Sequence, residues 1–138
     1  MNSEDCIFCK IAAGEIPAVK IWENDSAVAF LDIAPVSDGH TLIVSKQHYK
    51  TLDECPPEYL AKMLSEVGKI AKAVTEAVDS EGYNFLCNNG RAAGQLVDHL
   101  HFHIIPRNQG DGILKGWPSS EYPEGRAEEI AEKIKKNL

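Results

Sequence analysis

The spacing of hydrophobic and polar positions changes along the chain, and each spacing predicts one kind of element. Apolar residues recur every three or four positions from Pro57 to Val78, which predicts the main amphipathic helix. Shorter helical patterns cover 6–13 and 124–138. Short runs rich in apolar and β-branched residues predict strands at 19–23, 27–32, 83–87 and 97–105, with a further strand starting near His40.

The order of these elements predicts the fold class. Three strands, a helix, two strands and a final helix indicate an α+β domain built on an antiparallel five-stranded sheet. The main helix needs this sheet, because its apolar stripe must be covered. With 138 residues, the chain is expected to form one domain, 1–138.

Composition and charge narrow the classes of partner. The chain is 43% hydrophobic and 25% charged, as ordinary globular domains are, and its formal net charge is −7. Because binding to a nucleic-acid polymer depends on Lys and Arg, this charge argues against such a partner, whereas local backbone N–H groups can still hold a small anion. The chain has no long apolar run and no basic, apolar leader at its start, so we expect a cytoplasmic protein with no membrane partner.

Three of the five histidines alternate along one segment, as His99, His101 and His103. On a strand, side chains two residues apart leave the same face, so all three imidazoles would line one face while Leu100 and Phe102 leave the other. A neutral imidazole whose Nδ1–H is bonded to a carbonyl presents Nε2 as a nucleophile, and the middle ring is the natural candidate. A metal-chelating strand and purely structural histidines remain the alternatives.

A glycine-containing loop, 88–95, leads into the histidine strand. Glycines such as Gly94 permit close approach of the backbone to an anion, and Gln95 adds a neutral donor for a developing phosphoryl charge. Taken alone, the loop could equally be a simple turn between strands.

The segment 94–107, GQLVDHLHFHIIPR, resembles the signature of the histidine-triad (HIT) family. The resemblance covers nearly the whole chain, because it extends to CIFCKI at 6–11, GEIP at 14–17, FLDI at 30–33 and GHTLIV at 39–44. It implies a homodimer in which two sheets join into one. It also implies hydrolysis or transfer of a nucleoside monophosphate from a P–N, P–O or P–S linkage, without a catalytic metal.

Carried onto this sequence, the resemblance implies a role for each histidine of the site. His101 would be the nucleophile, with His99 and His103 as its flanking partners. His40 would be a fourth histidine bonded on the nucleophile side of the site.

The resemblance also implies the residues that bind the nucleotide. Asp32 would hold the ribose hydroxyls, Ile33 would line the base pocket, and Asn88 and Gln95 would contact the α-phosphate. A structural reading stays open for each, since Asp32 could cap a turn, Ile33 could be core and Asn88 could end a strand. Leu96 departs from the family pattern, in which Ser, Thr or Glu is common at this position.

Cys6 and Cys9 form a C-x-x-C pair without the βαβ context of a thioredoxin-like motif. Bacterial members that resemble this chain can bind zinc through the two cysteines and two histidines, which here would be His48 and His99. Two thiolates and two imidazoles make a closed structural set for tetrahedral zinc. The alternative is a pair of free thiols packed under the sheet, and Cys55 and Cys87 are expected to be unliganded.

These features predict an enzyme that cleaves a purine nucleoside monophosphate from an amine or another leaving group through a nucleotidyl-His101. The short chain, His40 and Trp117 near the C-terminus favour a phosphoramidase-like member. The alternatives are a dinucleoside polyphosphate hydrolase and a protein that binds nucleotides, as a sensor or scaffold, without turning them over.

Overall fold

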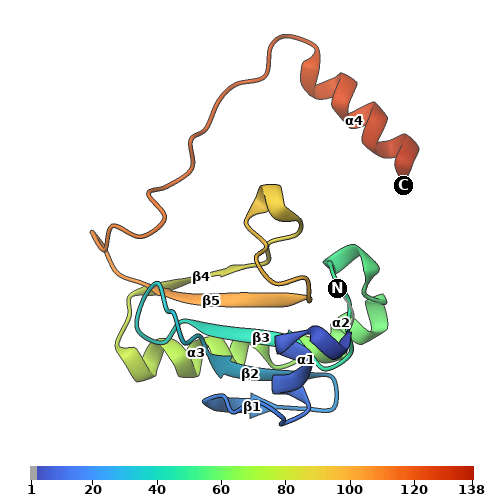
Figure 1. Cartoon of the computed structure of the whole chain (residues 1–138). Helices are drawn as coiled ribbons and strands as arrows, with labels where there is room; N and C mark the ends of the chain where they lie inside the picture. The colour runs from blue at the N-terminus through green and yellow to red at the C-terminus, as the bar shows by residue number, and fades with distance from the viewer. Residues whose placement is uncertain (1–2) are drawn as a thin grey trace.

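The computed structural model describes residues 3–138 and contains one five-stranded sheet with helices on both sides (Figure 1). Met1 and Asn2, part of the start used above to argue against a leader, lie outside the described residues. The elements, in chain order, are η1 (Ser3–Asp5), α1 (Ile7–Ala12), β1 (Lys20–Glu23), β2 (Ala27–Leu31), β3 (Thr41–Ser45), η2 (Leu52–Glu54), α2 (Pro57–Met63), α3 (Val67–Val78), β4 (Gly82–Leu86), η3 (Arg91–Ala93), β5 (His101–Arg107) and α4 (Arg126–Asn137).

The sheet is antiparallel throughout, in the order β1-β2-β3-β5-β4, which confirms the α+β class. The last strand in the sequence, β5, therefore lies between β3 and β4. In the β3–β5 pair, Leu42 is opposite His103 and Val44 is opposite His101. The histidines thus come from an interior strand, while β4 is an edge.

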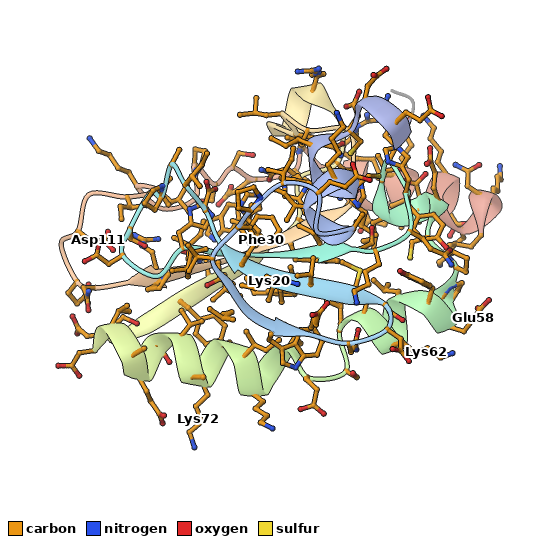
Figure 2. The ribbon with its side chains drawn as sticks, turned by 60° about the horizontal axis from the view of Figure 1, so that its bottom comes forward. Lys20, Phe30, Glu58, Lys62, Lys72 and Asp111 are labelled. Carbon is orange, nitrogen blue, oxygen red and sulfur yellow. The ribbon has the colours of Figure 1, made fainter. Side chains whose placement is uncertain are left out.

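Each face of the sheet has its own core. One face packs under α3, where Ile70 and Val74 meet Ile43, Phe102 and Ile104. The opposite face packs under α1, and its buried residues are Cys6, Phe8, Ile11, Val28, Phe30, Leu42 and Val44. Figure 2 shows α3 lying along the sheet, with the Lys72 side chain pointing away from the sheet into solvent.

Side chains of β5 alternate between the two faces, as the spacing predicted. Phe102 and Ile104 face α3, and His101 contacts Phe8 on the α1 side. The strand begins later than predicted, however, because β5 starts at His101 and His99 lies in the bend before it. His99 is fully buried there, with its backbone N–H bonded to the Val97 carbonyl at 2.8 Å. The prediction of three imidazoles on one strand therefore holds for two of them.

The predicted main helix is divided in two, between α2 and α3. The apolar period continues through the break, so periodicity could not reveal it. At the break, the Lys62 carbonyl accepts hydrogen bonds from Asn24 Nδ2 at 2.9 Å and from Ser65 Oγ at 3.0 Å. Side chains thus occupy a carbonyl that the next helical turn would use, which ends α2.

The C-terminal segment leaves the sheet after β5 and carries α4 at its far end (Figure 1). At its root, Arg107 bonds both carboxylate oxygens of Asp111, at 2.8 and 2.9 Å, and its Nη1 donates to Asn84 Oδ1 at 2.7 Å. We call residues 112–138 the arm. Over residues 3–138, no helix is long and apolar enough to span a membrane.

Candidate functional site

His101 is held in one tautomer by the backbone of the residue that precedes the strand. Its Nδ1 lies 2.7 Å from the His99 carbonyl oxygen. Since a carbonyl can only accept, Nδ1 carries the hydrogen and Nε2 keeps its lone pair. The arrangement predicted for a histidine nucleophile is thus present at His101.

Burial keeps the His101 ring neutral. Loss of solvent lowers the pKa of His101 below its usual value, and this outweighs the hydrogen bond to the His99 carbonyl, which raises it. The Phe8 ring contacts the imidazole edge-on, with centroids 5.0 Å apart and planes at 77°. A neutral, oriented imidazole can attack an electrophile at neutral pH.

His40 and His103 form a second hydrogen-bonded chain beside His101. The Val36 N–H donates to His40 Nδ1 at 3.2 Å, so the hydrogen of His40 is on Nε2, which lies 2.9 Å from His103 Nδ1. His103 Nδ1 therefore accepts, and the hydrogen of His103 is on Nε2. Burial lowers the pKa of His103 to about 4, with further lowering by His101 and His40.

The Nε2 atom of His103 is buried and has no hydrogen-bond partner among residues 3–138. A buried donor without a partner is costly, and such groups concentrate where a ligand completes them. The His101 and His103 ring centroids are 5.0 Å apart. One group bound between them could therefore meet a nucleophile and a hydrogen-bond donor together.

Asp32 and Ile33 lie just after β2, close to His40. Asp32 Oδ1 accepts from the Ala34 N–H at 2.9 Å, which is the turn cap considered from the sequence, and Oδ2 lies 3.8 Å from His40 Nε2. The Ile33 side chain is 94% exposed, so it is not core. Contacts of these residues with a ribose and a base stay predictions.

The loop 88–95 is held by its own glutamine. Gln95 is almost fully buried, its Oε1 accepts from the Gly90 N–H at 2.8 Å, and its Nε2 donates to the carbonyls of Lys50 and Val97 at 2.7 and 3.1 Å. Both amide hydrogens are thus used within the chain. The side chain shapes the loop, and a direct contact with phosphate stays a prediction.

Gly94 and Asn88 face each other within this loop. Gly94 has a φ of +90°, which a glycine adopts without strain, and a Cβ at this position would lie 3.7 Å from Asn88 Nδ2. Asn88 is half-buried. The predicted contact with the α-phosphate would therefore involve the Gly94 backbone, which no side chain shields, and the nearby Asn88 side-chain amide.

A second cluster joins the start of the chain to the histidine segment. The ligand atoms of Cys6, Cys9, His48 and His99 all lie within 4.8 Å of one another. His99 Nδ1 is 3.2 Å from Cys6 Sγ and 3.4 Å from Cys9 Sγ, and His48 Nδ1 is 3.2 Å from Cys9 Sγ. The sequence predicted the same four residues as metal ligands.

These four residues fit a tetrahedral zinc ion. With bond lengths of about 2.3 Å to sulfur and about 2.0 Å to nitrogen, sulfur and nitrogen ligands lie about 3.5 Å apart, near the separations found here. His99 Nε2 donates to the Ser45 carbonyl at 2.7 Å, so its Nδ1 presents a lone pair to the thiols. Burial raises the pKa of Cys9 to about 11 when no ion is present, and a bound zinc ion reverses this by favouring the thiolate.

Three residues of the two clusters were not found from the sequence. Phe8 contacts His101, Val36 fixes the tautomer of His40, and Ser45 fixes that of His99. Val36 and Ser45 act through backbone atoms, and the type of a residue does not show what its backbone atoms will bond. Only Phe8 could have been suggested by the sequence, because it lies between Cys6 and Cys9.

Comparison with known proteins identifies related chains. The HIT domain family model matches residues 13–110. An adenosine 5'-monophosphoramidase of Schizosaccharomyces pombe is 48% identical over 137 residues, which cover 94% of this chain and 98% of that protein. An adenylylsulfatase of Arabidopsis thaliana is 50% identical over 107 residues, which cover 78% of this chain but only 54% of that protein.

Solved structures share the fold. A HIT family protein from Bacillus anthracis has a TM-score of 0.91 and 38% identity, with 99% of both chains covered. A zinc-bound histidine triad family protein from Mycobacterium smegmatis has a TM-score of 0.74 and 33% identity, with 99% of this chain and all of that chain covered.

Proposed function

The chain belongs to the HIT domain family, and on this premise we propose that it hydrolyses adenosine 5'-monophosphoramidates and related conjugates, releasing AMP. The observation that carries this proposal is the pair formed by the free Nε2 lone pair of His101 and the unpartnered Nε2–H of His103. The names of the relatives, which are hydrolases of AMP conjugates, support the same activity.

In this proposal, His101 Nε2 attacks the α-phosphorus and forms a P–N bond while the bond from phosphorus to the leaving amine breaks. The departing amine takes a proton from solvent, and the water that attacks in the second step returns one. His103 Nε2–H donates to a phosphoryl oxygen, where negative charge develops, and the His40 hydrogen bond holds His103 in the donating tautomer. Water then attacks phosphorus, which releases AMP and restores His101.

The nucleotide would extend from His101 towards the end of β2. We assign the ribose hydroxyls to Asp32, the base to Ile33 and the α-phosphate to Asn88, Gly94 and Gln95. The exposed Ile33 side chain supports this assignment, because an apolar side chain that is uncovered in the free protein can gain contact with a base. The intrachain bonds of Gln95 favour contact through the loop backbone that its side chain holds.

We further propose that Cys6, Cys9, His48 and His99 hold a structural zinc ion. All four ligands come from the protein, so the ion would stabilise the chain and would leave no open position for substrate. The zinc-bound Mycobacterium smegmatis relative supports this proposal. A reducing compartment keeps such thiols available, which favours the cytoplasm.

The substrate class is tested by comparing turnover of an adenosine phosphoramidate with turnover of diadenosine polyphosphates. We expect the kcat/KM for the phosphoramidate to be the higher, because the relative named a monophosphoramidase matches almost the whole chain. Preference for the polyphosphates would support the alternative hydrolase. Saturable nucleotide binding without release of amine or AMP would support a sensor or scaffold and contradict the proposed enzyme.

We expect the 15.2 kDa chain to form a homodimer through the exposed edge of β4. Tyr83 and Phe85 are 48% and 40% exposed on this edge strand, and pairing it with the same strand of a second copy would join two sheets. Sedimentation velocity at micromolar concentration should give twice the mass of the chain. A species with the mass of one chain would contradict this expectation.

A further inference from the structure

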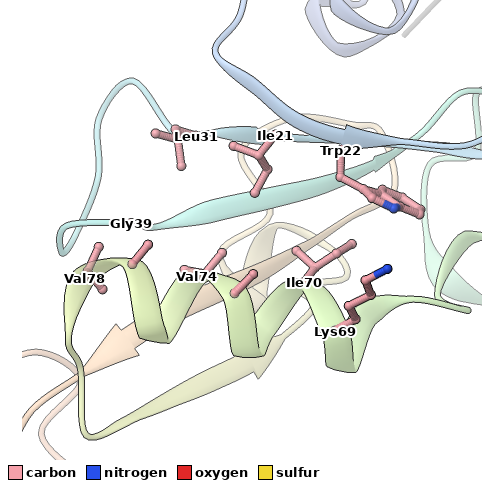
Figure 3. Close-up of a pocket in the computed structure, with 10 residues that line it drawn as sticks. Ile21, Trp22, Leu31, Gly39, Lys69, Ile70, Val74 and Val78 are labelled. Atoms are coloured by element: carbon pink, nitrogen blue, oxygen red, sulfur yellow. The ribbon is translucent and has the colours of Figure 1, made fainter.

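An apolar groove runs along α3 on the face of the sheet opposite the histidines (Figure 3). Its volume is about 530 Å³, and it is bounded by Ile21 and Trp22 of β1 and by the α3 residues Ile70, Val74 and Val78. Ala73 and Ala77 also line it, and these small side chains let another helix approach α3 closely. Lys69, at one end, is the only charged residue in the lining.

The arm carries a helix whose apolar side is only partly covered by residues 3–138. In α4, Ala127, Ile130, Ala131 and Ile134 recur at helical spacing and lie on one side. No residue of α4 is buried: Ile130 is partly exposed and Ile134 is 53% exposed. Its ion pairs, such as Arg126 with Glu129, all stay within the helix among the described residues.

Even so, α4 takes the same place in a crystal structure of a relative. The arm contains about a fifth of the residues, so two chains that differed throughout their arms could not share a TM-score much above 0.8. The Bacillus anthracis protein reaches 0.91 with 99% of both chains covered. Since Figure 1 shows α4 standing away from its own sheet, something outside the chain must favour this placement.

The charge at the start of the groove favours one orientation of α4. Lys69 lies near the start of α3 and lines the groove, whereas Lys72 points into solvent and lies 3.9 Å from Glu76. The first turn of α4 carries Glu128 and Glu129. A helix α4 that lies parallel to α3 therefore places its acidic first turn near Lys69.

We propose that α4 of each chain seats its Ile130 and Ile134 side chains in the α3 groove of a second copy. The arm supplies the reach, because its 112–125 segment contains neither helix nor strand. This contact is separate from the β4 edge and from the histidine site. It covers two apolar surfaces at once, the groove and the apolar side of α4.

Trp22, in the groove, reports on this contact. The chain has two tryptophans, so Trp117→Phe leaves Trp22 as the only one. In that background, Ile130→Asp with Ile134→Asp should shift the Trp22 emission maximum to longer wavelength, because the groove becomes open to water. The control is Glu132→Asp with Lys136→Asp, which makes the same change in charge on the polar side of α4 and should leave emission unchanged. Equal emission in the two variants would overturn the proposal.

A mixing experiment distinguishes α4 bound in the groove of a second copy from α4 bound in the groove of its own chain. The chain with Trp117→Phe, Ile130→Asp and Ile134→Asp, which keeps Trp22, is mixed with a chain that carries only Trp22→Phe and Trp117→Phe. Native mass spectrometry follows the formation of mixed dimers. Mixed dimers should recover the short-wavelength emission of Trp22, because the intact α4 of one chain fills the groove of the other. Mixed dimers without recovery, or no mixed dimers under conditions that exchange labelled wild-type chains, would contradict the proposal. Neither readout depends on turnover, so the proposed function can fail independently.

Discussion

His101→Ala should reduce turnover of an adenosine phosphoramidate by on the order of 10⁵-fold or more while leaving nucleotide binding largely intact. The Nε2 atom of His101 has its lone pair free because Nδ1–H is bonded to the His99 carbonyl at 2.7 Å. No neighbouring ring can replace it, since His103 presents a hydrogen at Nε2 rather than a lone pair. Single-turnover kinetics, with nucleotide affinity measured by calorimetry, tests both halves of the prediction.

His103→Ala and His40→Ala are the matched controls for His101→Ala. They remove a donor and the group that orients it, so each should cost on the order of 10² to 10⁴-fold. Rapid mixing of wild-type protein with labelled substrate should also trap an acid-labile label on the peptide that contains His101. If His101→Ala keeps substantial turnover while His103→Ala does not, the nucleophile is assigned to the wrong ring.

Removal of zinc, or Cys9→Ser, should lower the melting temperature by about 10 °C, equivalent to about 3 kcal/mol in a domain of this size. The four ligands connect α1, the segment after β3 and the bend before β5, so the ion would link parts of the chain that are distant in sequence. Elemental analysis of protein purified without chelator should give one zinc ion per chain. Calorimetry before and after chelation then measures the effect on stability.

The control for Cys9→Ser is Cys55→Ser, which removes a thiol outside the cluster. His99→Ala should differ from both, because it removes a ligand and disturbs the residue whose carbonyl orients His101, so stability and turnover should fall together. Protein that contains no zinc and whose melting temperature is unchanged by chelation would contradict the metal assignment.

Residue pattern predicted the strands and the antiparallel sheet, because alternation and turn residues act locally. It failed where distant groups decide local structure. The division of the main helix depends on Asn24, which bonds the Lys62 carbonyl from 38 residues away. The late start of β5 likewise reflects the burial of His99 between two thiols and Ser45, which no local spacing encodes.

For the two clusters too, local sequence pattern predicted the residues but not the distant contacts that orient them. The alternating histidines and the C-x-x-C pair could be read from the sequence, and the structure places the expected partners together. The tautomers could not be predicted, because they depend on the carbonyls of His99 and Ser45 and on the N–H of Val36. For Gln95, residue type suggested a free donor, whereas its amide hydrogens are used inside the chain.

The strand order has a consequence for how the protein acquires its site during folding. The strands β1, β2 and β3 form one antiparallel unit and β4 and β5 form another, and the two join only through the β3–β5 pairing. Both clusters span this seam, since Cys6 and His40 come from the first unit while His99 and His103 come from the second. A ribosome must therefore release the chain through His103 before both clusters can assemble, and a partly folded chain without the β3–β5 pairing would lack both the zinc site and the His40–His103 hydrogen bond.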